Sequence, residues 1–201
     1  MNLGQSILAL GALVILGLLG LNTNKAIMSE NSRVNSGESG IAAVSIAQSL
    51  TEEAMAKYFD ASPETAVPGE ITSTSSLTPV GSLGHGSGEG YRTGTSDFND
   101  FDDYNNLFLV YKSDKAGDAA TTPGADKEII VPGIDTKYYV KVRVQYVKVN
   151  ASNIPVADDT STVPTWHKKM TVTVINLSRR ASSESNAQDT LVYPAIMSYW
   201  R

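Results

Sequence analysis

Cysteine is absent from the 201 residues of this chain, which excludes disulfide bridges, thiol catalysis and cysteine-based zinc sites together. Histidine is rare, since only His85 and His167 occur, in unrelated contexts. There is no nucleophile elbow, no phosphate-binding glycine loop leading into a helix, and no HExxH motif. We therefore expect no enzymatic activity and no cofactor. His85 is expected in a solvated loop, and His167 in a packing or surface role.

Charge is also scarce. Asp, Glu, Lys and Arg make up 18% of the residues, and the formal net charge is -5. Lys and Arg form no cluster with interleaved aromatic residues, so nothing in the sequence indicates binding to nucleic acid. Ser, Thr, Asn and Gly are abundant instead, a composition that suits a surface exposed outside the cell.

One apolar run dominates the N-terminus. Residues 4–21 read GQSILALGALVILGLLGL, and no charged residue precedes Lys25. A secretory signal peptide is disfavoured, because no Lys or Arg precedes the run and the following residues offer only a poor small-x-small cleavage site. A permanent membrane anchor is a second interpretation, since about 20 apolar residues span a bilayer. The third is an assembly helix that is held in the membrane first and packs later against copies of itself.

Small residues among the leucines favour the assembly helix. Ala9, Gly11, Ala12, Gly17 and Gly20 would let helix backbones approach closely where lipid offers no hydrophobic drive of its own. We expect the helix to bend or loosen within residues 17–24. The predicted assembly interface consists of Gln5, Ile7, Leu8, Leu10, Gly11, Leu13, Val14, Leu16, Gly17, Leu18, Gly20 and Leu21.

The helix is expected to continue through residues 25–60 as an amphipathic segment. One helical face is marked by the spacing of Ala43, Ala47, Leu50, Ala54 and Tyr58. Glycines predict a kink within residues 35–40. A helix over residues 5–59 would be roughly 80 Å long at 1.5 Å per residue. That is too long to fit inside a domain made by the rest of the chain, so its apolar first half must project and be covered by lipid or other helices.

A long connection, residues 61–106, follows and is crowded with Pro, Gly, Ser and Thr. It ends in the acidic and aromatic sequence DFNDFDDYNN. Its carboxylates make calcium binding a possibility to test, although the EF-hand spacing is absent. In the alternative interpretation, the aromatic residues pin this segment to the helix while the carboxylates cap turns. The calcium candidates are Asp97, Asp100, Asp102 and Asp103.

The rest of the chain predicts an antiparallel sheet. Residues 107–113 and 128–131 read as short strands, and 138–149 alternates as a half-buried strand whose partner is 165–177. Residues 150–164 are expected to form a loop. A last strand at 190–199 contains Pro194, which predicts a position at the edge of the sheet. Asn150 and Asn176 begin N-x-[ST] sequences and are possible glycosylation acceptors.

Taken together, the apolar helix, its amphipathic continuation, the polar loop and the terminal sheet resemble the type IV pilin superfamily, which includes the pseudopilins. GQSILALGALVILGLLG is similar to the apolar assembly helix of that family. The FDDYNN segment and the strands YYVKVRVQYV and KKMTVTV are similar to the heads of prepilin-like proteins.

The resemblance implies a subunit stored in the cytoplasmic membrane and extracted by an assembly platform and its ATPase. Helices would form the core of a helical homopolymer, and sheets its outer surface. The family's leader usually ends in Gly and carries basic residues, whereas only Met1 to Gly4 precede Gln5 here. Whether residues 1–4 are cleaved stays open. Gln5 would stand at the first position of a cleaved chain, or near the family's early Glu in an uncleaved one.

The sequence thus predicts an α+β protein in four parts: a membrane or filament-core helix (1–24), its amphipathic continuation (25–60), a connecting loop with an acidic turn (61–106), and a sheet head (107–201). We expect a structural subunit of an extracellular filament at the cell surface. Two alternatives remain open. The first is a minor pseudopilin of a secretion machine, and the second is a monomeric, membrane-anchored protein whose head binds a ligand or glycan.

Overall fold

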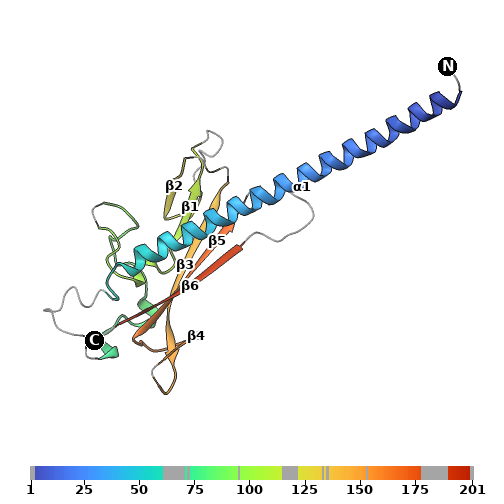
Figure 1. Ribbon diagram of the computed structural model, residues 1–201. Helices are drawn as coiled ribbons and strands as arrows, with labels where there is room; N and C mark the ends of the chain where they lie inside the picture. The colour runs from blue at the N-terminus through green and yellow to red at the C-terminus, as the bar shows by residue number, and fades with distance from the viewer. Residues whose placement is uncertain are drawn as a thin grey trace. The chain divides into compact units, whose positions relative to one another are not determined.

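The computed structural model describes residues 3–60, 71, 73–94, 96–114, 122–132, 134, 136–152, 154–177 and 190–199. In that part of the chain, one long helix precedes three short 3-10 helices and six strands (Figure 1). The chain divides into two units, residues 1–41 and residues 42–201. We refer to the second as the head unit. An apolar N-terminal helix followed by a mostly antiparallel sheet confirms the α+β class.

The helix α1 (Leu3–Met55) has no interruption in its assignment. The bend expected within residues 17–24 and the kink expected within 35–40 do not break it. Each glycine costs a helix only roughly 1 kcal/mol relative to Ala, and the helix formers on either side outweigh that penalty. The helix ends at Met55, a few residues before the expected end.

The last turns of α1 contribute one face to the core of the head unit. Ala43, Ala47, Leu50 and Ala54 are buried, which confirms the predicted helical face. Tyr58 was expected on the same face but is exposed. It lies beyond the end of the helix, where its backbone forms a bridge with Asp100 instead of extending the helical spacing. These residues belong to the same buried cluster as Val140, Val172 and other core residues of the sheet.

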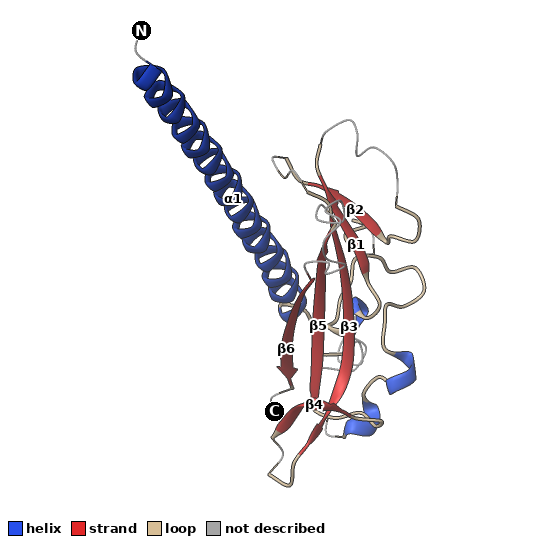
Figure 2. Ribbon diagram, turned by 90° about the vertical axis from the view of Figure 1, so that its right-hand side faces the viewer, coloured by secondary structure: helices blue, strands red, loops and turns tan. Residues whose placement is uncertain are grey.

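The sheet has the strand order β2-β1-β3-β5-β6 (Figure 2). Its strands are β1 (Phe108–Lys112), β2 (Lys127–Ile130), β3 (Tyr138–Val149), β5 (His167–Asn176) and β6 (Thr190–Ser198). All neighbouring pairs in this order are antiparallel except β1 and β2, which are parallel. The prediction of a wholly antiparallel sheet was therefore wrong at this edge. The long polar segment between β1 and β2 leaves room for the crossover that a parallel pair requires.

The central pair of strands, β3 and β5, carries the core. Val140 lies opposite Val174, Val142 opposite Val172, and Val144 opposite Met170, and all six side chains are buried. Lys141 and Arg143 alternate with them and are exposed. The predicted pairing of these two strands and the predicted exposed and buried faces of β3 are confirmed. Fully burying each such apolar side chain contributes about 1.5–3 kcal/mol.

Of the two remaining strands, β4 was not predicted from the sequence, whereas the edge position of β6 was. β4 (Pro155–Thr160) pairs with the end of β3, although residues 150–164 were expected to form a loop. The residues of β4 are mostly exposed, and their sequence PVADDT carries no hydrophobic alternation to identify a strand. β6 lies at the edge of the sheet beside β5, as Pro194 predicted.

Aromatic residues of the connecting segment pack against the helix and the sheet. The rings of Phe98 and Tyr104 meet edge to face with centroids 5.1 Å apart, and Tyr91 packs on both. These three side chains belong to the same buried cluster as Ala47 and Leu50 of the helix. The aromatic part of the acidic turn therefore pins this segment to α1, as one of the two predicted interpretations required.

Candidate functional site

The predicted assembly interface lies wholly within the first unit of the chain. Leu3–Asn31 is a helical segment long and apolar enough to cross a membrane, and within the described residues it is the one such segment. Every predicted interface residue is exposed within the chain, including Leu13 at 67% and Leu16 at 70%. Leu, Ile and Val also occupy consecutive positions, so apolar side chains surround the helix instead of forming a single stripe. An apolar surface of this kind needs lipid or other helices around it.

The glycines of this segment have no role in the fold of the chain. A Cβ atom added at Gly11, Gly17 or Gly20 would meet nothing within 4 Å. Each glycine nevertheless weakens the helix by roughly 1 kcal/mol relative to Ala. Small residues at exposed positions of a helix would allow the close approach of a second helix. Gln5 is exposed. Residues 1 and 2, and with them the question of leader cleavage, lie outside the described residues.

The four predicted calcium candidates do not share one environment. Asp97 is exposed, and its Oδ1 accepts a hydrogen bond from the Gly94 N–H at 2.7 Å. That bond lowers the pKa of the Asp97 carboxyl. Asp100, Asp102 and Asp103 are buried. The described residues contain no group of three or more His, Asp or Glu side chains placed to hold a metal ion.

Two of the buried carboxylates organise the turn that contains them. Asp100 Oδ1 accepts from the backbone N–H groups of Asp102 and Asp103 at 2.9 and 3.0 Å. Asp103 Oδ2 accepts from the N–H of Asn99 at 2.8 Å and from that of Asp100 at 3.2 Å. These contacts match the predicted alternative in which the carboxylates cap turns. They fix the 3-10 helix η3 (Asp102–Tyr104), whose three residues are all buried.

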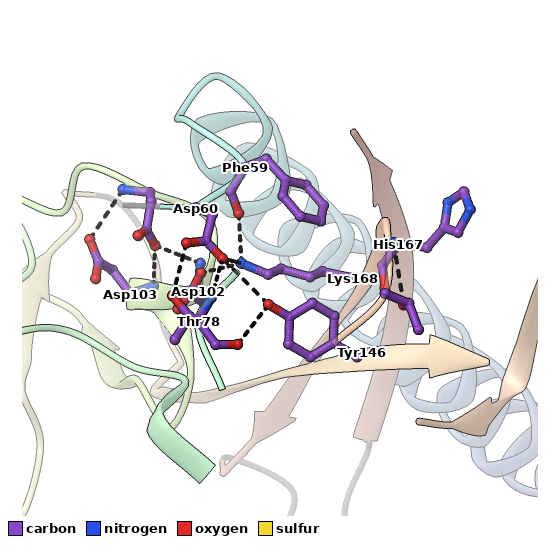
Figure 3. Close-up of polar contacts among 10 residues, drawn as sticks. Phe59, Asp60, Thr78, Asp102, Asp103, Tyr146, His167 and Lys168 are labelled. Atoms are coloured by element: carbon purple, nitrogen blue, oxygen red, sulfur yellow. Dashed lines mark hydrogen bonds and ion pairs between the residues drawn. The ribbon is translucent and has the colours of Figure 1, made fainter. Parts of the chain in front are cut away.

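The sequence did not identify the residue on which these acids converge. Lys168, on β5, is fully buried, and its Nζ donates to the Phe59 carbonyl at 2.7 Å and to Asp60 Oδ2 at 2.9 Å (Figure 3). It also forms a hydrogen-bonded ion pair with Asp102 Oδ1. Lys168 lies on the same face of β5 as Met170, so the alternating pattern marked the position as inward. Its polar side chain made the inward position easy to discount.

Asp60 is held from several sides. Its Oδ2 accepts from the Thr78 N–H at 3.0 Å, and its Oδ1 accepts from the Thr78 hydroxyl at 2.9 Å. The Tyr146 hydroxyl donates to the Thr78 carbonyl at 2.9 Å and lies 3.4 Å from Asp60 Oδ2. We call Asp60, Thr78, Asp102, Tyr146 and Lys168 the Lys168 cluster. It joins the end of α1, the connecting segment, η3 and two strands of the sheet.

The electrostatics of this cluster follow from its burial. Desolvation raises the pKa of Asp100 to about 8, with further contributions from the negative charges of Asp102 and Asp103. Burial also raises the pKa of Asp102, although the nearby charge of Lys168 opposes the shift. The pKa of Asp103 is raised by burial as well, against its backbone hydrogen bonds. Lys168 therefore lies near three carboxyl groups, those of Asp100, Asp102 and Asp103, whose raised pKa values disfavour their simultaneous ionisation.

The other sequence-predicted residues are not members of the Lys168 cluster. His85 is exposed and stacks on Phe98, with centroids 5.7 Å apart. His167 Nδ1 lies 2.7 Å from the Ser198 Oγ, across the β5–β6 pair. Asn150 is exposed in a turn, where its Oδ1 accepts from the N–H groups of Ser152 and Ile154, each at 2.9 Å. Asn176 is buried at the end of β5, and residue 178 of its motif lies outside the described residues.

Comparisons with known proteins give no relative from which a role could be inferred. No protein-family model matches the chain, and no curated protein or solved structure shows significant similarity to it.

Proposed function

We propose that this chain is a pilin-like structural subunit that assembles into an extracellular filament through the apolar first part of α1. One observation carries the proposal: a single helix is exposed and apolar around its circumference in residues 3–21, while its residues 43–54 belong to the core of a folded head unit. Residues 3–21 of such a helix require an apolar environment from outside the chain. Residues 43–54 already have one in the core of the head unit. Lipid provides that environment before assembly, and sister helices provide it afterwards.

The glycines support packing between helices. Gly11, Gly17 and Gly20 weaken the helix and face open space within the chain. A helix that only crossed lipid would gain nothing from their small size. Close approach of sister helices would increase van der Waals contact at these positions.

A charged residue on the apolar segment tests the proposal. Leu13→Asp or Leu16→Asp should abolish filaments on the cell surface, because the helix core would have to bury an ionised carboxylate. The head unit should remain folded, since neither residue contributes to its core. Val163→Asp is the matched control, because Val163 is 62% exposed in a loop of the head unit. Electron microscopy that showed normal filaments from either leucine variant would reject the proposal.

Shearing the cells separates the remaining alternatives. A filament subunit should be released in long fibres, whereas a minor pseudopilin of a secretion machine should be released in short ones. A monomeric, membrane-anchored binding protein should remain with the membrane. That last function has one specific support, because Leu3–Asn31 is long and apolar enough to span a bilayer without any partner.

A further inference from the structure

The Lys168 cluster brings a primary amine and two carboxyl groups together where water is excluded. The side chains of Lys168 and Asp60 are 0% exposed, and that of Asp102 is 3% exposed. Lys168 Nζ contacts Asp60 Oδ2 at 2.9 Å and also contacts Asp102 Oδ1. Two aromatic rings cover the amine, with Nζ 4.6 Å from the centroid of Phe59 and 5.3 Å from that of Tyr146. The groups are held as reactants would be held in an active site.

The two carboxyl groups have different surroundings, and these suit different roles. Asp60 accepts hydrogen bonds on both oxygens from Thr78 and faces the Tyr146 hydroxyl, so its ionised form is well stabilised. Asp102 lies in the buried 3-10 helix, and burial raises its pKa, which favours the neutral acid. A neutral carboxylic acid is the form that an amine can attack. An adjacent carboxylate is the group that can remove a proton from the ammonium.

We propose that Lys168 and Asp102 condense to form an isopeptide bond, with Asp60 acting as the proton acceptor and donor. Asp60 Oδ2 takes a proton from the Lys168 ammonium, and the neutral Nζ attacks Cγ of the protonated Asp102. The tetrahedral intermediate loses one carboxyl oxygen as water, which receives the proton held by Asp60, and Asp60 then takes the second proton from Nζ. The Lys168 ammonium, the Asp60 carboxylate and the neutral Asp102 acid become a neutral amide, one water molecule and a neutral Asp60. No oxidant, cofactor or external reagent is consumed.

Preorganisation is what makes this condensation favourable. Well-oriented intramolecular groups can reach effective molarities on the order of 10⁵–10⁸ M, which offsets the tendency of water to hydrolyse an amide. Condensation also removes a pair of buried charges, whose desolvation is costly in a low-dielectric interior. Burial of core side chains such as Tyr146 and Met170 stabilises the arrangement of these groups.

The bond would act as a covalent staple in a chain that has no cysteine. It would join η3 to β5 across 66 positions of sequence. Such a link constrains the unfolded chain in the way that a disulfide does. The inference does not rest on the proposed filament, because it concerns the head unit of a single chain.

Peptide mapping of the full-length protein provides the test. After complete digestion with trypsin, Asp102 lies in the peptide 93–112, and a modified Lys168 lies in 149–169, because the amide blocks cleavage after residue 168. We expect one branched species that contains both peptides and weighs one water molecule less than their sum. Finding the two peptides only as separate, unmodified species would overturn the proposal. A branched species that contains peptide 58–92 in place of 93–112 would place the bond on Asp60 and overturn the assigned roles.

Variants separate the roles of the three side chains. Lys168→Arg keeps the positive charge but removes the amine, so the branched species should disappear. Asp60→Asn should keep one of the two hydrogen bonds from Thr78 but reduce the yield of the branched species at least tenfold, because the proton acceptor is lost. Lys169→Arg, at the neighbouring position, is the control and should leave the yield unchanged. Equal yields in wild type and Asp60→Asn would overturn the role of Asp60, even if Lys168→Arg failed to fold.

Discussion

The hydroxyl of Tyr104 donates a 3.0 Å hydrogen bond to Glu53 Oε1, although 51 positions separate the two residues in the chain. Glu53 is on α1, and its Oε2 also accepts from the Tyr91 hydroxyl at 3.2 Å and pairs with Arg92. The guanidinium of Arg92 lies over the ring of Tyr91, 5.1 Å from its centroid. One carboxylate thus ties the last turns of the helix to the aromatic residues of the connecting segment.

Removing that carboxylate should destabilise the head unit. Glu53→Ala would leave the buried Tyr104 hydroxyl without its acceptor, at a cost of about 1–3 kcal/mol in the free energy of unfolding. Glu53→Gln keeps an acceptor oxygen and should cost less. Urea unfolding followed by tryptophan fluorescence measures both. Glu52→Ala, at an exposed neighbouring position, should stay within about 0.5 kcal/mol of wild type. Equal losses for the two alanine variants would show that the Tyr104 contact contributes nothing.

The alanines on α1 should be intolerant of larger side chains. Ala47 is fully buried in the core cluster, and Ala47→Leu should lower the free energy of unfolding by about 1–3 kcal/mol, because the added methyl groups would have to displace packed neighbours. Gln48→Leu places the same side chain at an exposed position one residue further on and should be nearly neutral. Chemical denaturation of the two variants gives the comparison. A neutral Ala47→Leu would mean that the helix and the sheet do not pack closely.

Stability should fall as the pH rises, through Asp100. The pKa of Asp100 is about 8 in the folded chain, against an ordinary value near 3.9 in the unfolded chain. The folded state therefore holds the proton more tightly. The contribution of the Asp100 carboxyl to the free energy of unfolding is full below about pH 4 and is lost as the pH rises through about 8.

Replacing Asp100 by Asn gives the matching experiment. Asp100→Asn keeps the oxygen that accepts from the backbone of η3 but cannot ionise. The variant should be more stable than wild type at about pH 8 and should lose less stability between about pH 5 and pH 8. Thermal unfolding across this range measures the difference. Parallel curves for the two proteins would show that Asp100 does not titrate there.

Calcium should leave the head unit unchanged. The buried carboxylates of Asp100, Asp102 and Asp103 already contact backbone N–H groups or the Lys168 ammonium, and Asp97 caps a separate turn. Any ion that bound only the folded state would raise the melting temperature with its concentration. We expect identical melting curves for the full-length protein in calcium and in a chelator. A rise with calcium would restore these four residues as a candidate site.

Segments with a regular spacing of apolar residues were predictable from sequence, because that spacing shows which side chains are buried and which are exposed. β3 and β5 alternate so regularly that their pairing and their buried faces could be assigned before the structure. The helical face of Ala43 to Ala54 was equally clear. In contrast, β4 is mostly exposed and has no alternating pattern, and its contacts with the end of β3 include an ion pair between Lys148 and Asp159.

The Lys168 cluster could not be predicted because its members are distant in sequence. Lys168 stands at an inward position of its strand, but a lysine is rarely buried, and Asp60 resembles the polar end of a helix. Only the fold shows that α1 ends where Asp60 can meet β5. The acidic turn was noticed for its density of carboxylates, but the cation that faces them comes from a strand 66 positions away from Asp102.

The two borders of the sheet also limit what neighbouring molecules can do to one another. β2 is four residues long, and β6 carries Pro194, which has no N–H to offer an incoming strand. Many copies could therefore crowd together at high local concentration without their sheets merging into an amyloid-like ribbon. In a filament of the proposed kind, cohesion would come from the apolar N-terminal helices, and the sheets of neighbouring head units would stay separate.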